Sequence, residues 1–222
     1  MNSSIQVTAS LMCADQLNLG QHIIELEKAG IDGLHIDIMD HSFVPNLALS
    51  IDTFNQIRRM TDLPMEVHLM VQKPYTIIPE LNYDKDDRII FHIESDFSDI
   101  VKTFDKDNVN WGFAISPGSS FSEISENMLE IIDCILILTV NPGFAGQQMI
   151  SSTYDKLKTF IEEIGRNYPL EYIIDGHVDK VLIEKYVSLG VYNFVGGTTG
   201  LYTSEQNVDY KNNIVRLKNV KI

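Results

Sequence analysis

Strand-like and helix-like stretches alternate along the whole chain, and this regular order limits the folds that are open to it. Eight short runs rich in apolar and β-branched residues are predicted as strands: Ile5–Ser10, Gly33–Ile38, Pro64–Met70, Arg88–Ile93, Asn110–Ile115, Ile135–Val140, Glu171–Asp175 and Tyr192–Gly196. None of the connections is rich enough in Pro, Gly or Ser to mark a domain boundary. The pattern indicates one unit of a strand and a helix that is repeated.

The stretches between the strands carry apolar residues three or four positions apart, which is typical of helices. Helices are predicted over Asn18–Ala29, Ile51–Met60, Pro74–Leu81, Phe97–Phe104, Phe121–Leu129, Ser152–Ile164, Asp179–Leu189 and Gln206–Lys218. Gly30 follows the first of them in the position that a left-handed helix cap prefers.

Eight such units within 222 residues favour a parallel (β/α)₈ barrel over an open doubly wound sheet. An open sheet of the dinucleotide-binding type would carry glycines at its first strand–helix turn, and Ser10–Asp15 contains none. We therefore predict an α/β protein that forms a single TIM-barrel domain over residues 1–222.

Charge and apolar content exclude several classes of partner. The chain has 31 acidic and 17 basic residues, a net charge of −14, which disfavours binding to nucleic acid or anionic lipid because both need a basic face. The apolar run Ile131–Val140 is interrupted by Asp133 and is too short to span a bilayer. Met1–Ile5 does not resemble the start of a signal peptide. We expect a cytoplasmic protein in which Cys13 and Cys134 are reduced thiols.

Side chains that can bind a metal lie at the ends of three predicted strands, where a barrel of this type places its chemistry. His35 and Asp37 share one face of the second strand, His68 lies in the third, and Asp175 ends the seventh. For His35 and Asp37 alone, a hydrogen-bonded pair in the barrel interior is an equal alternative. Two imidazoles and two carboxylates together suit one divalent metal such as Zn, Fe, Mn or Co.

The two aspartates come from strands on different sides of the predicted barrel. Asp37 and Asp175 should therefore approach a bound molecule from opposite sides. One carboxylate could remove a carbon-bound proton and the other return a proton to the opposite face, with a metal stabilising the enediolate between these steps. This arrangement predicts an epimerisation.

Two glycine-bearing loops follow late strands, Asn141–Gln147 after the sixth and Gly196–Gly200 after the eighth. Glycines allow the backbone to approach a phosphate closely, and barrels of this type often bind phosphate in this region. Turn geometry alone is the alternative explanation for these glycines.

Five motifs together resemble the ribulose-phosphate 3-epimerase family, over nearly the whole chain. They are His35–Asp40, Phe43–Asn46, Val67–Met70, Thr139–Gln147 and Ile174–Gly176. Within that family, three further segments are more similar to the branch that acts on D-allulose 6-phosphate: Ser10–Cys13, Gly143–Gln147 and Thr198–Tyr202.

The resemblance implies a ribulose-phosphate-binding barrel that inverts C3 of a phosphorylated ketose, with Asp37 as proton acceptor and Asp175 as proton donor. It implies a divalent metal on His35, Asp37, His68 and Asp175. Substrate contacts are expected from Ser10, His68, Met39, Met70, Gly143, Phe144, Ala145, Gly146, Gly176, His177, Gly197, Thr198 and Thr199. We expect a small phosphorylated ketose as the partner, and we favour the pair D-allulose 6-phosphate and D-fructose 6-phosphate over the pentulose phosphates. We also expect a homo-oligomer.

Four sites depart from the family pattern. His41 and Ser42 replace a glycine and a basic residue, Leu138 replaces a methionine near the reacting carbons, Ile173 replaces a glutamate, and His177 replaces a small residue beside the expected phosphate. These departures leave open which ketose phosphate is the substrate.

Three alternatives are weighed against the hexulose phosphate epimerase. The first is a D-ribulose 5-phosphate/D-xylulose 5-phosphate 3-epimerase. The second is a catalytically silent phospho-sugar-binding barrel, although a mere binder has no use for the two opposed carboxylates Asp37 and Asp175. The third is a decarboxylase or aldolase, which would need a catalytic lysine at a strand end. Lys73 follows the third strand but is predicted to lie in a loop.

Overall fold

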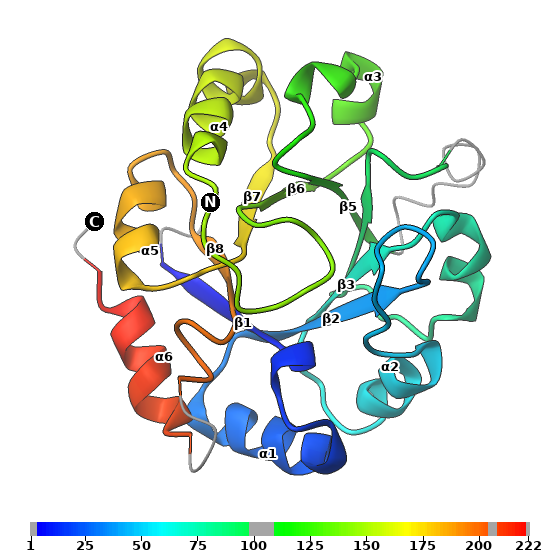
Figure 1. Ribbon diagram of the computed structural model, residues 1–222, viewed down its shortest axis with the longest axis vertical. Coiled ribbons are helices and arrows are strands. Elements are labelled where there is room, and N and C mark those ends of the chain that lie inside the picture. The colour runs from blue at the N-terminus through cyan, green and yellow to red at the C-terminus, as the bar shows by residue number, and fades with distance from the viewer. Residues whose placement is uncertain (1–3, 98–108, 204–207, 221–222) are drawn as a thin grey trace.

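The predicted barrel is confirmed by a computed structural model, which describes residues 4–97, 109–203 and 208–220. Eight parallel strands close into a barrel in chain order (Figure 1). They are β1 Gln6–Ser10, β2 Gly33–Met39, β3 Met65–Met70, β4 Arg88–His92, β5 Asn110–Ile115, β6 Cys134–Leu138, β7 Glu171–Asp175 and β8 Asn193–Gly196.

The described residues contain six α-helices, which surround the strands on the outside of the barrel (Figure 1). They are α1 Leu19–Ala29, α2 Ile51–Arg58, α3 Glu126–Leu129, α4 Ser152–Glu163, α5 Lys180–Val187 and α6 Tyr210–Lys218. Short 3₁₀ segments lie at Leu11–Cys13, Gln16–Asn18, Pro74–Thr76, Ile78–Glu80, Phe121–Glu123 and Gly165–Asn167. Among these described helices, none combines the length and the apolar character needed to cross a membrane.

Local sequence sets the helix ends. Ser50, Asp179 and Asp209 each precede a helix and accept a hydrogen bond from a backbone N–H of its first turn. Gly30 ends α1 with a φ of 84°, as predicted, because this left-handed conformation carries no Cβ penalty in glycine.

The prediction of a helix over Pro74–Leu81 is wrong. The segment forms two separate 3₁₀ turns, Pro74–Thr76 and Ile78–Glu80. Pro79 has no N–H to donate and its ring crowds the preceding turn, so a continuous α-helix is interrupted there.

Two other predicted helices differ from the structure in extent within the described residues. Phe121–Leu129 is a 3₁₀ turn followed by the short α3, because Ile124 is extended between them. Most of Phe97–Phe104 lies outside the described residues. The first residues of Gln206–Lys218 also lie outside the described residues, and the helix that follows them begins at Tyr210.

The register of the strands brings distant residues to one level of the barrel. Asp37 on β2 pairs with His68 on β3, and Leu138 on β6 pairs with Asp175 on β7. A small cluster of buried apolar side chains packs separately from the main core, and all of them come from strands: Ile90, Ala114, Cys134, Leu136, Leu138, Ile173 and Val195. The predicted site residues on β2, β3 and β7 are therefore held by a rigid, packed scaffold.

Asp87 connects three elements just before β4 begins. Its fully buried carboxylate accepts hydrogen bonds from Arg58 Nη1 at 2.9 Å, from Met65 N at 2.8 Å and from Asp84 N at 2.8 Å. It therefore links α2, the first residue of β3 and the turn before β4.

We predict that Asp87→Ala lowers the free energy of unfolding by about 3 kcal/mol, because it leaves the Arg58 cation and two N–H groups unpaired. Urea unfolding measures this change. Asp86→Ala is the matched control, since Asp86 is exposed, and it should change stability by less than about 0.5 kcal/mol. Equal effects of the two substitutions would contradict the role given to Asp87.

Candidate functional site

Four metal-competent side chains converge at one end of the barrel. His35 and Asp37 come from β2, His68 from β3 and Asp175 from β7, and one ligand atom of each lies within 4.8 Å of all the others. Asp37 Oδ1 lies 3.4 Å from His35 Nε2 and 3.2 Å from His68 Nδ1. Asp175 Oδ2 lies 3.8 Å from each of the same two nitrogens.

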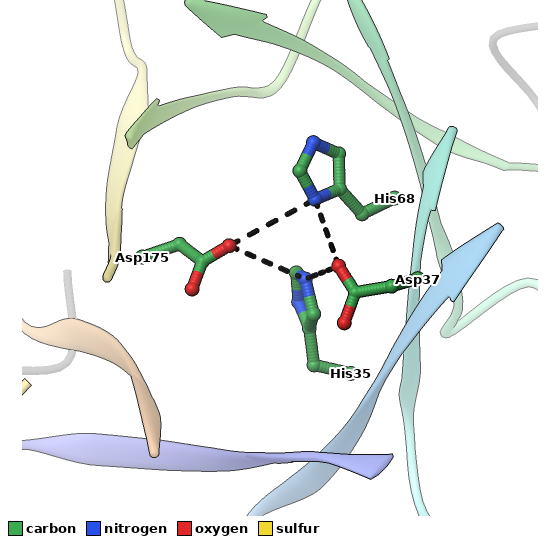
Figure 2. A group of neighbouring side chains, drawn as sticks. All are labelled: His35, Asp37, His68 and Asp175. Atoms are coloured by element: carbon green, nitrogen blue, oxygen red, sulfur yellow. Dashed lines mark hydrogen bonds and ion pairs between the residues drawn. The ribbon is translucent and has the colours of Figure 1, made fainter. Parts of the chain in front are cut away.

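Figure 2 shows how these side chains face one another. Asp175 approaches from β7 on one side and Asp37 from β2 on the other, while the two imidazoles point into the space between them. The structure thus brings together all four residues that the sequence predicted as a cluster.

The spacing and chemistry of this cluster fit a divalent cation. A tetrahedral ion with bonds of about 2.1 Å needs ligand atoms roughly 3.4 Å apart, which is close to the separations between these imidazoles and carboxylates. His35 Nε2 is buried and has no hydrogen-bond partner among the described residues, although it faces two carboxylates. An unpaired buried ring nitrogen is costly unless something else occupies its lone pair.

The two carboxylates experience different environments. Burial opposes ionisation of Asp37, but His35 and His68 beside it hold the pKa of that carboxyl well below its usual range. Burial raises the pKa of Asp175, and the neighbouring charge of Asp37 raises it further. Two carboxylates whose proton affinities are moved apart are suited to different roles in proton transfer.

In His35 and His68, the ring nitrogen that points away from the cluster contacts a further side chain. His35 Nδ1 lies 3.1 Å from Glu66 Oε2. His68 Nε2 lies 2.9 Å from His92 Nε2, and His92 Nδ1 lies 2.9 Å from Glu94 Oε2. Such partners orient metal-ligating imidazoles and fix their tautomers.

Sequence reasoning gave no role to Glu66 or Glu94. Glu66 alternates with His68 on β3, so the two-residue period of a strand is the signal that places it on the inward face. His92 is fully buried and lies within hydrogen-bonding distance of His68. Burial lowers the pKa of His92 to about 4, so this ring is neutral at pH 7.

A pocket with about 550 Å³ of open space lies next to the cluster. It is lined by twelve of the predicted contact residues, which are Ser10, Met39, Met70, Gly143, Phe144, Ala145, Gly146, Gly176, His177, Gly197, Thr198 and Thr199. Asp37 and Asp175 also line it, whereas His68 is fully buried and does not. Residues not predicted for it include Met12, Cys13, Leu138, Val140, Asn141, Pro142, Gln147, Val178 and Val195.

The loop between β6 and α4 crosses in front of the barrel opening (Figure 1). Side-chain donors occupy its carbonyl groups: Gln147 Nε2 donates to Asn141 O at 2.6 Å and to Phe144 O at 2.8 Å. Among the described residues, no hydrogen-bond acceptor is found for the backbone N–H groups of Gly143, Ala145, Gly146 and Gln147, all of which line the pocket.

Two neighbouring loops hold this loop from either side. Asn46 Nδ2 donates to Gly143 O at 2.6 Å, and His177 Nδ1 donates to Gln147 O at 2.9 Å. Gly176 has a φ of 106°, and a Cβ there would lie 2.8 Å from Thr139 Oγ1. Only glycine fits this position without displacing the β6 end.

The departures from the family pattern have distinct structural settings. His41 and His177 both adopt positive φ, 59° and 49°, which is uncommon for residues other than glycine. Leu138 and Ile173 belong to the same buried cluster, but only Leu138 also lines the pocket. Ile173 is therefore a packing residue, and Leu138 and His177 are the departures that line the pocket.

Comparisons with known proteins agree on one family. The model of the ribulose-phosphate 3 epimerase family matches residues 6–201. Ribulose-phosphate 3-epimerase of Treponema pallidum is 31% identical over 201 residues, which cover 89% of this chain and 92% of that protein. The Bacillus subtilis ribulose-phosphate 3-epimerase is 32% identical over 199 residues, covering 87% and 91%.

Two solved structures with similar folds are much more distant in sequence. One is KGPDC from Streptococcus mutans, at a TM-score of 0.68 and 10% identity, covering 98% of this chain and 96% of that one. Another is thiamine phosphate pyrophosphorylase from Pyrococcus furiosus, at a TM-score of 0.63 and 12% identity, covering 97% and 94%. These likenesses support the barrel fold alone. The family match and the sequence relatives go further, and they show that this chain belongs to the ribulose-phosphate 3-epimerase family, a family of isomerases.

Proposed function

We propose that the chain is a metal-dependent epimerase that inverts C3 of a phosphorylated ketose, and that D-allulose 6-phosphate and D-fructose 6-phosphate are its preferred pair. One observation carries the proposal. Asp37 and Asp175 both line the pocket, and their side chains approach each other from opposite sides (Figure 2). Asp37 takes the proton from C3 on one face, and Asp175 returns a proton on the other.

His35, Asp37, His68 and Asp175 would hold the divalent ion. When bound, this ion supplies positive charge that stabilises the enediolate oxygens. Ser10 Oγ donates to Asp37 Oδ2 at 3.1 Å, so the base is oriented from its second oxygen. Met39 and Met70, which pack together with Met12 at the pocket, would shield the reacting carbon from water.

The phosphate group would bind at the far loops through neutral donors. Residues 143–147, Gly176, His177 and Gly197 line the pocket and would offer backbone N–H groups to the phosphate, and Thr198 and Thr199 would add hydroxyl groups. None of these donors depends on a basic side chain, so the acidity of the whole chain is no obstacle.

The hexulose preference rests on the similarity of Ser10–Cys13, Gly143–Gln147 and Thr198–Tyr202 to the D-allulose 6-phosphate branch. The pentulose pair is the second candidate, because the relatives of this chain are named ribulose-phosphate 3-epimerases. A homo-oligomer and a single domain over residues 1–222 remain parts of the proposal.

We predict that His68→Ala strongly lowers the content of divalent metal in the purified protein, because it removes one of four ligands. The loss should be roughly tenfold or more in affinity. Metal analysis after dialysis against a chelator measures it. His22→Ala on α1 is the control, since His22 contacts Tyr210 far from the cluster and should leave the metal content unchanged. Full occupancy in His68→Ala would refute the ligand assignment.

We also predict that the metal-loaded enzyme incorporates deuterium from D₂O at C3, and does so faster with D-allulose 6-phosphate than with D-ribulose 5-phosphate. Free D-allulose should be roughly 100-fold poorer in kcat/KM, because two charge-assisted hydrogen bonds to phosphate contribute about 1.5 kcal/mol each. NMR of the C3 position follows the label. A faster reaction with the pentulose would replace the hexulose preference, and equal rates with free sugar would remove the phosphate site.

A further inference from the structure

A line of charged side chains runs through the barrel next to the metal-competent cluster. His35, Glu66 and Arg88 lie on the adjacent strands β2, β3 and β4 and pair in register, so they share one level of the barrel. Arg88 Nη1 donates to Glu66 Oε1 at 3.2 Å, and Arg88 Nη2 pairs with Glu171 at the start of β7. Asp37 and His68 lie two residues further along their strands.

The two nitrogens of His35 face different surroundings. Nε2 has no hydrogen-bond partner among the described residues and points at Asp37 and Asp175. Nδ1 lies 3.1 Å from Glu66 Oε2. An imidazole binds a cation only through a nitrogen that carries no hydrogen, so a metal on Nε2 requires the hydrogen on Nδ1. A carboxylate at Nδ1 favours this tautomer, because an ionised carboxylate only accepts hydrogen bonds.

Glu66 is surrounded by donors. Thr8 Oγ1 donates to Oε2 at 2.9 Å, in addition to His35 on that oxygen and Arg88 on the other. Glu66 is only 4% exposed, so these donors take the place of water around its carboxylate. The side chain is thus held as an acceptor on both oxygens.

We propose that Glu66 is a positioning residue for the metal centre, which holds His35 with Nε2 toward the cluster, and that Arg88 keeps Glu66 in this role. The inference rests on the proposed function, because it assumes that His35 binds a divalent ion. A purely structural ion pair between Glu66 and Arg88 is the competing explanation. It predicts lower stability after substitution but unchanged metal affinity in the folded protein.

Glu66→Gln separates the two explanations. Glutamine has one oxygen where glutamate has two, so its amide N–H₂ must face either Arg88 or His35, both of which are donors. Glu171→Gln is the matched control. This substitution removes the other carboxylate that pairs with Arg88. The Glu171 side chain is half-exposed and does not contact His35.

The test is a titration of the metal-free proteins with Co²⁺ and Zn²⁺ in competition with a chelator, alongside the Co²⁺ absorption spectrum and thermal melting without metal. Glu66→Gln should weaken binding roughly 10–100-fold and change the Co²⁺ spectrum, and Glu171→Gln should do neither. Arg88→Met should also weaken metal binding. If Glu66→Gln does not fold, the metal affinity of Arg88→Met tests the proposal instead.

Wild-type affinity and spectrum in a folded Glu66→Gln or Arg88→Met protein would overturn the inference while leaving the proposed function intact. Equal weakening by Glu171→Gln would also overturn it, because the effect would then follow the ion pair and not the contact with His35. Wild-type protein that binds neither ion would overturn the proposed function and this inference together.

Discussion

Two carboxylates and two imidazoles lie together at the mouth of the barrel, and the rest of the site depends on this placement. Carboxylates this close repel each other unless positive charge lies between them. In the protein alone, His35 supplies part of that charge: burial opposes its protonation, but Asp37, Glu66 and Asp175 outweigh burial and raise the pKa of His35 well above its usual value. A divalent cation would replace this protonation and leave both carboxylates ionised.

The same cluster explains why the fold suits the proposed chemistry. Asp37 and Asp175 lie on strands at different positions around a closed barrel, so the sheet holds their backbones apart. The loops between strands and helices provide the other half of the pocket. Their N–H groups would bind a phosphate without basic side chains, which is consistent with a net charge of −14.

Much of this could be predicted from the sequence. The alternating pattern indicated the barrel, and the rule that chemistry lies at strand ends selected His35, Asp37, His68 and Asp175 before the structure placed them together. The contacts of Glu66 and His92 could not be predicted, because they depend on the register between neighbouring strands. The helix predicted over Pro74–Leu81 is absent for a local reason, because Pro79 lacks the N–H that a continuous helix needs there.

The most direct test of the account is proton exchange at C3 in Asp37→Asn and Asp175→Asn proteins whose metal content has been verified. Each variant keeps one base, which reaches one face of the substrate only. We predict that each variant exchanges the C3 hydrogen of a single epimer with D₂O, a different epimer in the two cases, and that neither interconverts the epimers. Interconversion of both epimers at a near-native rate by either variant would contradict the two-base account.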